Sequence, residues 1–160
     1  MSAFFIRINP LVIRLLRSRA HWPLSTKVGL LQYSGRKSGR RYETPVAWHR
    51  VGDAVVIALT ERQGRNWWRN YRTPWPLSLQ AGRNTIHGVA VALQPDSDAF
   101  AAWMNALLRV HPYLRPIFAV GGIRRDLTAD ELARLRQSSG LVVLASSDAE
   151  LQRLLATPPV

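Results

Sequence analysis

The sequence contains no cysteine, which excludes disulfides, thiolate nucleophiles, iron–sulfur clusters and cysteine zinc sites. No stretch approaches the ~20 uninterrupted apolar residues of a membrane-spanning helix. Acidic residues are scarce: 10 Asp and Glu stand against 22 Lys and Arg, which gives a formal net charge of +12. Such an excess indicates a polyanionic partner, either a nucleic acid, an anionic membrane surface or an acidic cofactor.

A chain of 160 residues that is 47% hydrophobic suits one domain with a core. We expect this domain to consist of an N-terminal amphipathic helix with its lead-in over residues 1–26, a barrel over 27–146 and a C-terminal helix over 147–160. The basic N-terminal helix begins at Asn9-Pro10, and either packs on the domain as a lid or contacts a membrane surface. Without a small-residue cleavage site, we predict a cytoplasmic protein, with membrane association at the inner face as the alternative.

Six segments combine strand-like composition with flanking turn residues. They cover residues 28–33, 42–50, 54–60, 77–81, 85–93 and 141–145. Helix signals follow the fifth strand: Asp96 or Ser97 as an N-cap, a capping box over Thr128–Glu131, and an N-cap at Ser147. Strands in hairpin order with grouped helices predict an antiparallel barrel or another α+β arrangement.

A basic loop with two glycines joins the first two predicted strands. Gly35 and Gly39 permit positive φ and allow backbone N–H groups to converge on an anion. Cationic side chains supply charge-assisted hydrogen bonds to phosphate or carboxylate oxygens. These side chains are Arg36, Lys37, Arg40 and Arg41. The loop therefore predicts an anion site, and a solvated basic hairpin is the alternative.

A second basic segment, residues 61–72, contains four arginines and three aromatic residues. Trp67 and Trp68 are adjacent, so both cannot face the core from one regular element, and one is free to line a pocket. The arginines of this segment can join the glycine loop around an anion. Basic residues interleaved with aromatics also suit single-stranded nucleic acid, although the arginines are dispersed along the chain.

The two segments together carry a family resemblance. Residues 30–39 (LLQYSGRKSG), then Thr44-Pro45, residues 55–58 (VVIA), residues 67–70 (WWRN), and a strand ending at Gly82-Arg83 resemble the deazaflavin-dependent nitroreductase family in order and spacing. The resemblance runs from about Asn9 to Leu93. It implies an α+β split β-barrel that binds coenzyme F₄₂₀, a hydride carrier with a phosphate and an oligoglutamate tail.

The resemblance also implies site residues. By position, Arg36, Lys37 and Ser38 with Gly39 would hold the phosphate, while Arg40 and Arg41 would reach the glutamate tail. Pro45, Thr60, Trp67 and Asn70 match further coenzyme-binding positions, and Tyr113 matches a tyrosine-bearing segment that lines the substrate pocket. The sequence departs from the family at Tyr42, where a basic residue is often found, and at Glu61, where a lysine can occur.

We therefore expect an F₄₂₀-dependent oxidoreductase that transfers hydride between the reduced coenzyme and an electron-poor or unsaturated organic substrate, with FMN as the less favoured cofactor. Such chemistry resides in the cofactor, so no catalytic acid or base is required. The four histidines show no metal-ligand spacing, and we expect no metal site. The alternatives are a non-catalytic carrier of F₄₂₀, flavin or haem and, third, a basic nucleic-acid-binding protein. Homodimerisation is compatible with each.

Overall fold

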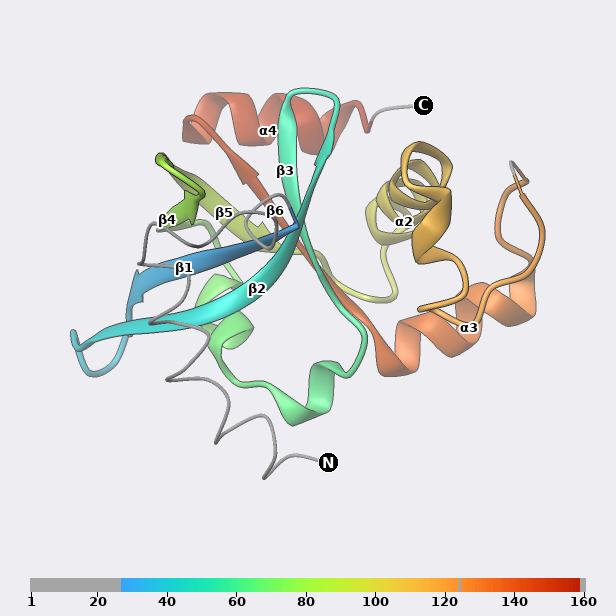
Figure 1. Ribbon diagram of the computed structural model, residues 1–160, viewed down its shortest axis with the longest axis horizontal. Coiled ribbons are helices and arrows are strands. Elements are labelled where there is room, and N and C mark those ends of the chain that lie inside the picture. The colour runs from blue at the N-terminus through green and yellow to red at the C-terminus, as the bar shows by residue number, and fades with distance from the viewer. Residues whose placement is uncertain (1–26, 124, 159–160) are drawn as a thin grey trace.

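Six antiparallel strands close into a barrel with the strand order β1-β2-β3-β6-β5-β4 (Figure 1). The computed structural model describes residues 27–123 and 125–158, and the predicted N-terminal helix lies outside them. The strands are β1 (Val28–Ser34), β2 (Arg41–Val51), β3 (Ala54–Leu59), β4 (Trp75–Ala81), β5 (Asn84–Ala92) and β6 (Gly140–Ala145). All six predicted strands are therefore present, with ends shifted by two residues at most, in an arrangement consistent with a split barrel.

Strand β2 pairs with different neighbours along its two halves. Its first seven residues, from Arg41 to Ala47, pair with β1, and its last four, from Trp48 to Val51, pair with β3. Pro45 lies in the first half, where β2 has no ladder to β3, so its missing N–H interrupts no pairing on that side. The first half of β2 therefore has no strand beside it on the β3 side, and this gap in the ladder lies at the end of the barrel near the β1–β2 loop.

Side chains of the irregular segment between β3 and β4 fill this end of the barrel. The segment contains two short 3₁₀ helices, η2 (Arg62–Gly64) and η3 (Trp67–Tyr71). Trp67 and Tyr71 are buried and belong to the same hydrophobic cluster as Leu31, Ile57 and Leu79 of the barrel interior. The alternation of apolar residues on the strands thus supplies a barrel core that is completed by aromatic residues from a non-strand segment.

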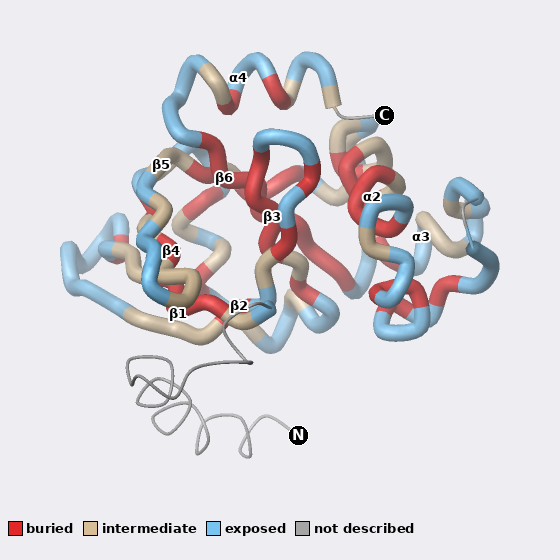
Figure 2. The backbone as a smooth tube through the Cα atoms, turned by 45° about the horizontal axis from the view of Figure 1, so that its top comes forward, coloured by how far each residue is buried: buried red, intermediate tan, exposed pale blue. Residues whose placement is uncertain are grey.

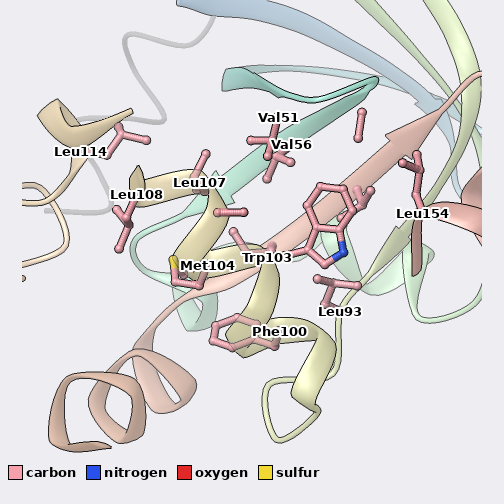
Figure 3. Close-up of a cluster of buried hydrophobic side chains, with 14 of the residues drawn as sticks. Val51, Val56, Leu93, Phe100, Trp103, Met104, Leu107, Leu108, Leu114 and Leu154 are labelled. Carbon is pink, nitrogen blue, oxygen red and sulfur yellow. The ribbon is translucent and has the colours of Figure 1, made fainter. Parts of the chain in front are cut away.

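The opposite wall, formed by β3 and β6, is buried on both faces (Figure 2). Three helices follow β5 or β6: α2 (Asp98–Val110), α3 (Ala129–Ser138) and α4 (Asp148–Ala156). Val56 and Val143 face outward and pack with Trp103 of α2, within the cluster that Figure 3 shows. A strand buried on both faces reads as a continuous apolar run, as the sequences of β3 and β6 do.

Side-chain caps define where the helices begin. Ser97 caps α2 by accepting a hydrogen bond from the Phe100 N–H. Of the two residues predicted as possible caps, Asp96 and Ser97, the cap is therefore Ser97. Thr128 forms the predicted capping box of α3 with Glu131. Ser147 caps α4. Within the described residues, no helix is long and apolar enough to cross a bilayer.

Candidate functional site

The β1–β2 loop is a tight turn held by its own backbone. The Gly35 N–H donates to the Arg40 carbonyl (2.9 Å) and the Gly39 N–H donates to the Gly35 carbonyl (2.8 Å). Gly39 adopts the positive φ that glycine permits (+63°), whereas Gly35 does not. A Cβ at position 35 would lie 2.7 Å from Oγ of Ser38, so a side chain there would require the Ser38 hydroxyl to shift.

Most N–H groups of this loop already have acceptors. The Arg36 N–H donates to Oδ1 of Asn70 (3.1 Å) and the Arg40 N–H donates to Oγ of Ser38 (3.3 Å). Within the described residues, the N–H groups of Lys37 and Ser38 have no hydrogen-bond acceptor. Both residues are exposed, so the tip of the loop carries the Lys37 ammonium and two N–H groups that no described residue engages.

The guanidinium of Arg36 binds the chain rather than solvent. Its Nη2 donates to the carbonyls of Thr73 (2.7 Å) and Pro74 (2.9 Å), and its Nε donates to the carbonyl of Asn70. It also lies 4.3 Å from the ring centroid of Trp75 in a cation–π contact. Arg36 therefore fixes the loop against the segment that follows η3.

Asn70 joins the two basic segments. Its side-chain oxygen accepts the Arg36 N–H, and its Nδ2 donates to the carbonyl of Trp67 (3.0 Å). The structure thus brings together three of the predicted cofactor-binding residues, Arg36, Asn70 and Trp67. Trp67 itself is only 6% exposed and lies edge-on to Tyr71, whereas its neighbour Trp68 is half-buried at the surface.

A row of aromatic rings leads from the loop into the barrel. Tyr42 stacks on Tyr33 with ring centroids 5.4 Å apart, and Tyr33 lies edge-on to the buried Tyr71. Burial raises the pKa of Tyr71, with Tyr33 adding to the increase, so this phenol stays protonated. Tyr33, Arg41 and Tyr42 also line a hollow of about 490 Å³ beside the base of the loop, which extends over β4 and β5 to Ser78 and His87.

Two other predicted coenzyme positions lie on or beside strands. Pro45 is half-buried within β2, opposite Leu30 of β1. Thr60 is exposed and directly follows the last residue of β3. No contact between either residue and the loop is seen among the described residues.

Tyr113 lies far from the basic loop. Its hydroxyl group is 3.1 Å from Nδ1 of His49 and 3.0 Å from Nζ of Lys27, the residue before β1, whereas the loop follows the last residue of β1. The seven residues of β1 separate the two places by roughly 20 Å. Burial, together with the nearby His111 and Lys27, lowers the pKa of His49 from 6.5 to about 4.

Sequence reasoning missed two features of the site. One is the role of Arg36 in holding the loop, because a guanidinium group that can donate hydrogen bonds to a phosphate can also donate them to backbone carbonyls. The other is Trp75, whose ring receives Arg36 and whose Nε1–H donates to the carbonyl of Ser34 (3.1 Å). A tryptophan at the start of a strand, after a proline, gave no distinguishing signal.

Comparison with known proteins supports the fold alone. No family model matches the sequence, and no curated protein matches it. Among solved structures, a FAD and heme binding protein from Mycobacterium smegmatis matches with a TM-score of 0.50 and 21% identity over 81% of this chain. The chain spans 65% of the length of that protein.

Two further structures extend the comparison. A domain-swapped dimer matches with a TM-score of 0.50 and 13% identity, over 90% of this chain and 99% of the other. An F₄₂₀-H₂ dependent reductase matches with a TM-score of 0.46 and 15% identity, over 73% of this chain and 93% of the other. The described barrel therefore shares its fold with the FAD and heme binding protein and with the domain-swapped dimer, without a shared activity being shown.

Proposed function

We propose that this chain binds coenzyme F₄₂₀ through its β1–β2 loop and is an F₄₂₀-dependent oxidoreductase. The observation that carries the proposal is the pair of N–H groups of Lys37 and Ser38, which have no acceptor among the described residues and lie on the same turn as the Lys37 ammonium. Backbone hydrogen bonds within the turn and the bond from the Arg36 N–H to Asn70 hold this loop in place. A fixed cluster of donors and positive charge suits a phosphate group. Arg40 and Arg41 are exposed on the same turn and would serve the acidic tail.

Arg36 takes a positioning role in this proposal. Its guanidinium is occupied by carbonyls of residues 70–74, so it orders the loop that presents Lys37 and Ser38. Trp67 supports the site from inside the barrel, Asn70 connects the two segments, and Pro45 and Thr60 flank them. The hollow lined by Arg41 and Tyr42 continues from the loop and offers space for the remainder of a long coenzyme.

When bound, the coenzyme supplies the hydride, and the organic acceptor takes up that hydride together with a proton. The described residues contribute binding, orientation and shielding from water. Tyr113 remains our proposed substrate-pocket residue. Since it lies at the opposite end of β1 from the phosphate loop, the coenzyme must extend along the barrel for a substrate beside Tyr113 to meet it.

Titration of the protein with F₄₂₀, followed by the fluorescence of the coenzyme, tests the proposal. We expect saturable binding that Lys37→Ala weakens by about 1–3 kcal/mol, the usual cost of a lost charge-assisted contact. Arg83→Ala, which removes an exposed arginine from the β4–β5 turn, is the matched control. Absence of saturable binding to the unmodified protein would refute the assignment, as would equal effects of the two substitutions.

A second candidate function is a carrier that binds the coenzyme without turnover. One observation favours it: the potential proton donors Tyr113 and His49 lie at the other end of β1 from the loop, and His49 is held in its neutral form. The FAD and heme binding protein with the same fold illustrates that the fold suits cofactor binding. A carrier would bind F₄₂₀H₂ without oxidising it in the presence of any member of a panel of nitro compounds and enones, whereas an oxidoreductase would oxidise it with at least one.

We also propose that the protein forms a homodimer. The support is a set of exposed apolar side chains around the end of α2, together with the domain-swapped dimer among the similar folds. These side chains are Val110, Tyr113, Ile117 and Ile123. Light scattering should give twice the chain mass at micromolar concentration and the monomer mass for Ile117→Glu. A monomer in both samples would overturn the proposal.

A further inference from the structure

A second hollow among the described residues lies apart from the β1–β2 loop, and none of the residues that line it belongs to that loop. It has a volume of about 840 Å³, within the usual range of small-molecule sites. Its walls come from η2 and η3, from the connection between β5 and α2, and from the C-terminal end of α3. The side chains that define its charge are Arg62, Arg72 and Arg136, with Asp96 as the carboxylate in its lining.

Trp68 forms an aromatic wall of this hollow and is surrounded by cations. The guanidinium carbons of Arg62, Arg69 and Arg72 lie 5.6, 5.8 and 5.8 Å from the centroid of the Trp68 ring system. The Trp68 Nε1–H donates to the carbonyl of Arg62 (3.0 Å), which fixes the orientation of the indole. Three like charges around one ring repel each other, and the aromatic face offsets this repulsion only in part.

Arg136 brings a fourth positive charge from α3. Its Nε is buried, and within the described residues it has no hydrogen-bond partner. A buried N–H without an acceptor costs about 1–3 kcal/mol. Arg136 stands in the last turn of α3, and among the described residues no carboxylate forms an ion pair with it.

The carboxylates of the described residues leave Arg62, Arg72 and Arg136 without an ion-pair partner. Among the described residues, ion pairs join Arg109 to Asp126, Arg125 to Glu131, and Arg153 to both Asp53 and Glu150. Arg62, Arg72 and Arg136 make no ion pair with a described carboxylate, including Asp96. The hollow thus retains net positive charge next to an apolar floor of Ala92, Leu93 and Pro95.

We propose that this hollow is a second ligand site, which binds a small molecule carrying a phosphate or carboxylate group on a ring. The oxyanion accepts hydrogen bonds from Arg72 and Arg136, and the ring lies against Trp68 and the apolar floor. The site is separate from the proposed coenzyme site, because Arg36 donates to the carbonyls of Asn70 and Thr73, whereas no residue of the β1–β2 loop lines the hollow. The proposal does not depend on which coenzyme the loop binds.

Calorimetric titration with phenyl phosphate and with inorganic phosphate tests this site in the full chain. We expect phenyl phosphate to bind at least about tenfold more tightly than inorganic phosphate, because only the former places a ring against Trp68. Arg72→Gln and Arg136→Gln should each weaken phenyl phosphate binding by roughly tenfold or more. Arg83→Gln, which removes an exposed arginine from the β4–β5 turn, should leave it unchanged.

The outcomes separate the two sites. Loss of phenyl phosphate binding in Lys37→Gln with retention in Arg72→Gln would overturn the second site and assign the anion to the loop. No detectable heat at about 5 mM phenyl phosphate would also overturn it. Retained binding in Lys37→Gln together with loss in Arg72→Gln supports it, even if F₄₂₀ does not bind. Because Arg72 is exposed, its substitution preserves the fold, which thermal unfolding verifies for both arginine variants.

Discussion

The backbone N–H of Arg36 donates a hydrogen bond to the side-chain oxygen of Asn70, 3.1 Å away and 34 positions along the chain. This bond links the turn that carries the loop cations to the segment that completes the barrel interior. The shape of the proposed phosphate site therefore depends on a neutral amide side chain as well as on its own charges.

Replacing Asn70 by alanine should weaken F₄₂₀ binding without removing any charge. The variant loses the acceptor for the Arg36 N–H and the donor to the Trp67 carbonyl, so we expect the unfolding free energy to fall by about 1–2 kcal/mol. Denaturant unfolding and coenzyme titration measure the two effects. Asn66→Ala is the matched control, because Asn66 is exposed and makes no side-chain capping bond. Equal behaviour of the two variants would contradict the linking role.

Stability should decrease in mild acid because of His49. Its pKa is lowered from 6.5 to about 4 by burial first, then by His111 and Lys27. Between pH 6.5 and about pH 4 the unfolded chain binds a proton at His49 that the folded chain does not, so the unfolding free energy falls as pH decreases, by up to about 3 kcal/mol in total. Above pH 6.5 His49 gives the unfolding free energy no pH dependence. Urea unfolding from about pH 7.5 to pH 4.5 measures this slope. His49→Gln should flatten it, and an unchanged slope would assign the acid sensitivity to other groups.

Glu131 should stabilise the chain more than other exposed carboxylates do. It accepts hydrogen bonds from Arg125 and from the N–H groups of Thr128 and Gly121, and this environment, Arg125 foremost, holds the pKa of its carboxyl group well below the usual range. Glu131→Gln should reduce the unfolding free energy by roughly 1–2 kcal/mol. Glu150→Gln, at the same helical position of α4 but without a capping box, should cost less. Thermal unfolding of both variants gives the comparison.

Gly88 should tolerate no side chain. A Cβ at this position would lie 1.9 Å from the carbonyl oxygen of Ala145, a backbone atom of β6 that cannot rotate away. We expect Gly88→Ala to lose about 3 kcal/mol or more of stability, at the upper end of overpacking effects. Gly64→Ala provides the control, since nothing lies within 4 Å of a Cβ there. Comparable melting temperatures for the two variants would show that β5 and β6 can move apart.

The elements of the fold were predictable because their signals are local. Strand-like composition and flanking turn residues located the strands, and the Thr128 and Ser147 caps located two helices. The sequence also indicated that two adjacent tryptophans would not both face the core; Trp67 is buried and Trp68 is half-buried. Which strand β2 pairs with along each half was not predictable, since pairing depends on contacts between residues far apart in the sequence.

The candidate site was predictable in composition more than in geometry. The glycine loop was identified as cationic, yet the sequence does not distinguish an arginine that faces a ligand from one that binds carbonyls, as Arg36 does. Tyr113 was expected near a substrate, and its distance from the loop follows from the path of β1, which no local pattern specifies. The sequence identified the arginines around Trp68 as part of a basic segment. It did not indicate that Arg136 of α3 lines the same hollow, because the tertiary fold alone brings these residues together.

The division of β2 between two partners has a consequence for hydrogen exchange. In the half of β2 that precedes Trp48, no ladder hydrogen bond joins β2 to β3, and the side chains of Trp67 and Tyr71 complete the barrel there. Residues 62–71 can therefore move outward while the pairings of β1 with β2 and of β3 with β6 persist. Amide protons of this segment should exchange by local opening, on a faster scale than those of the doubly buried β3 and β6.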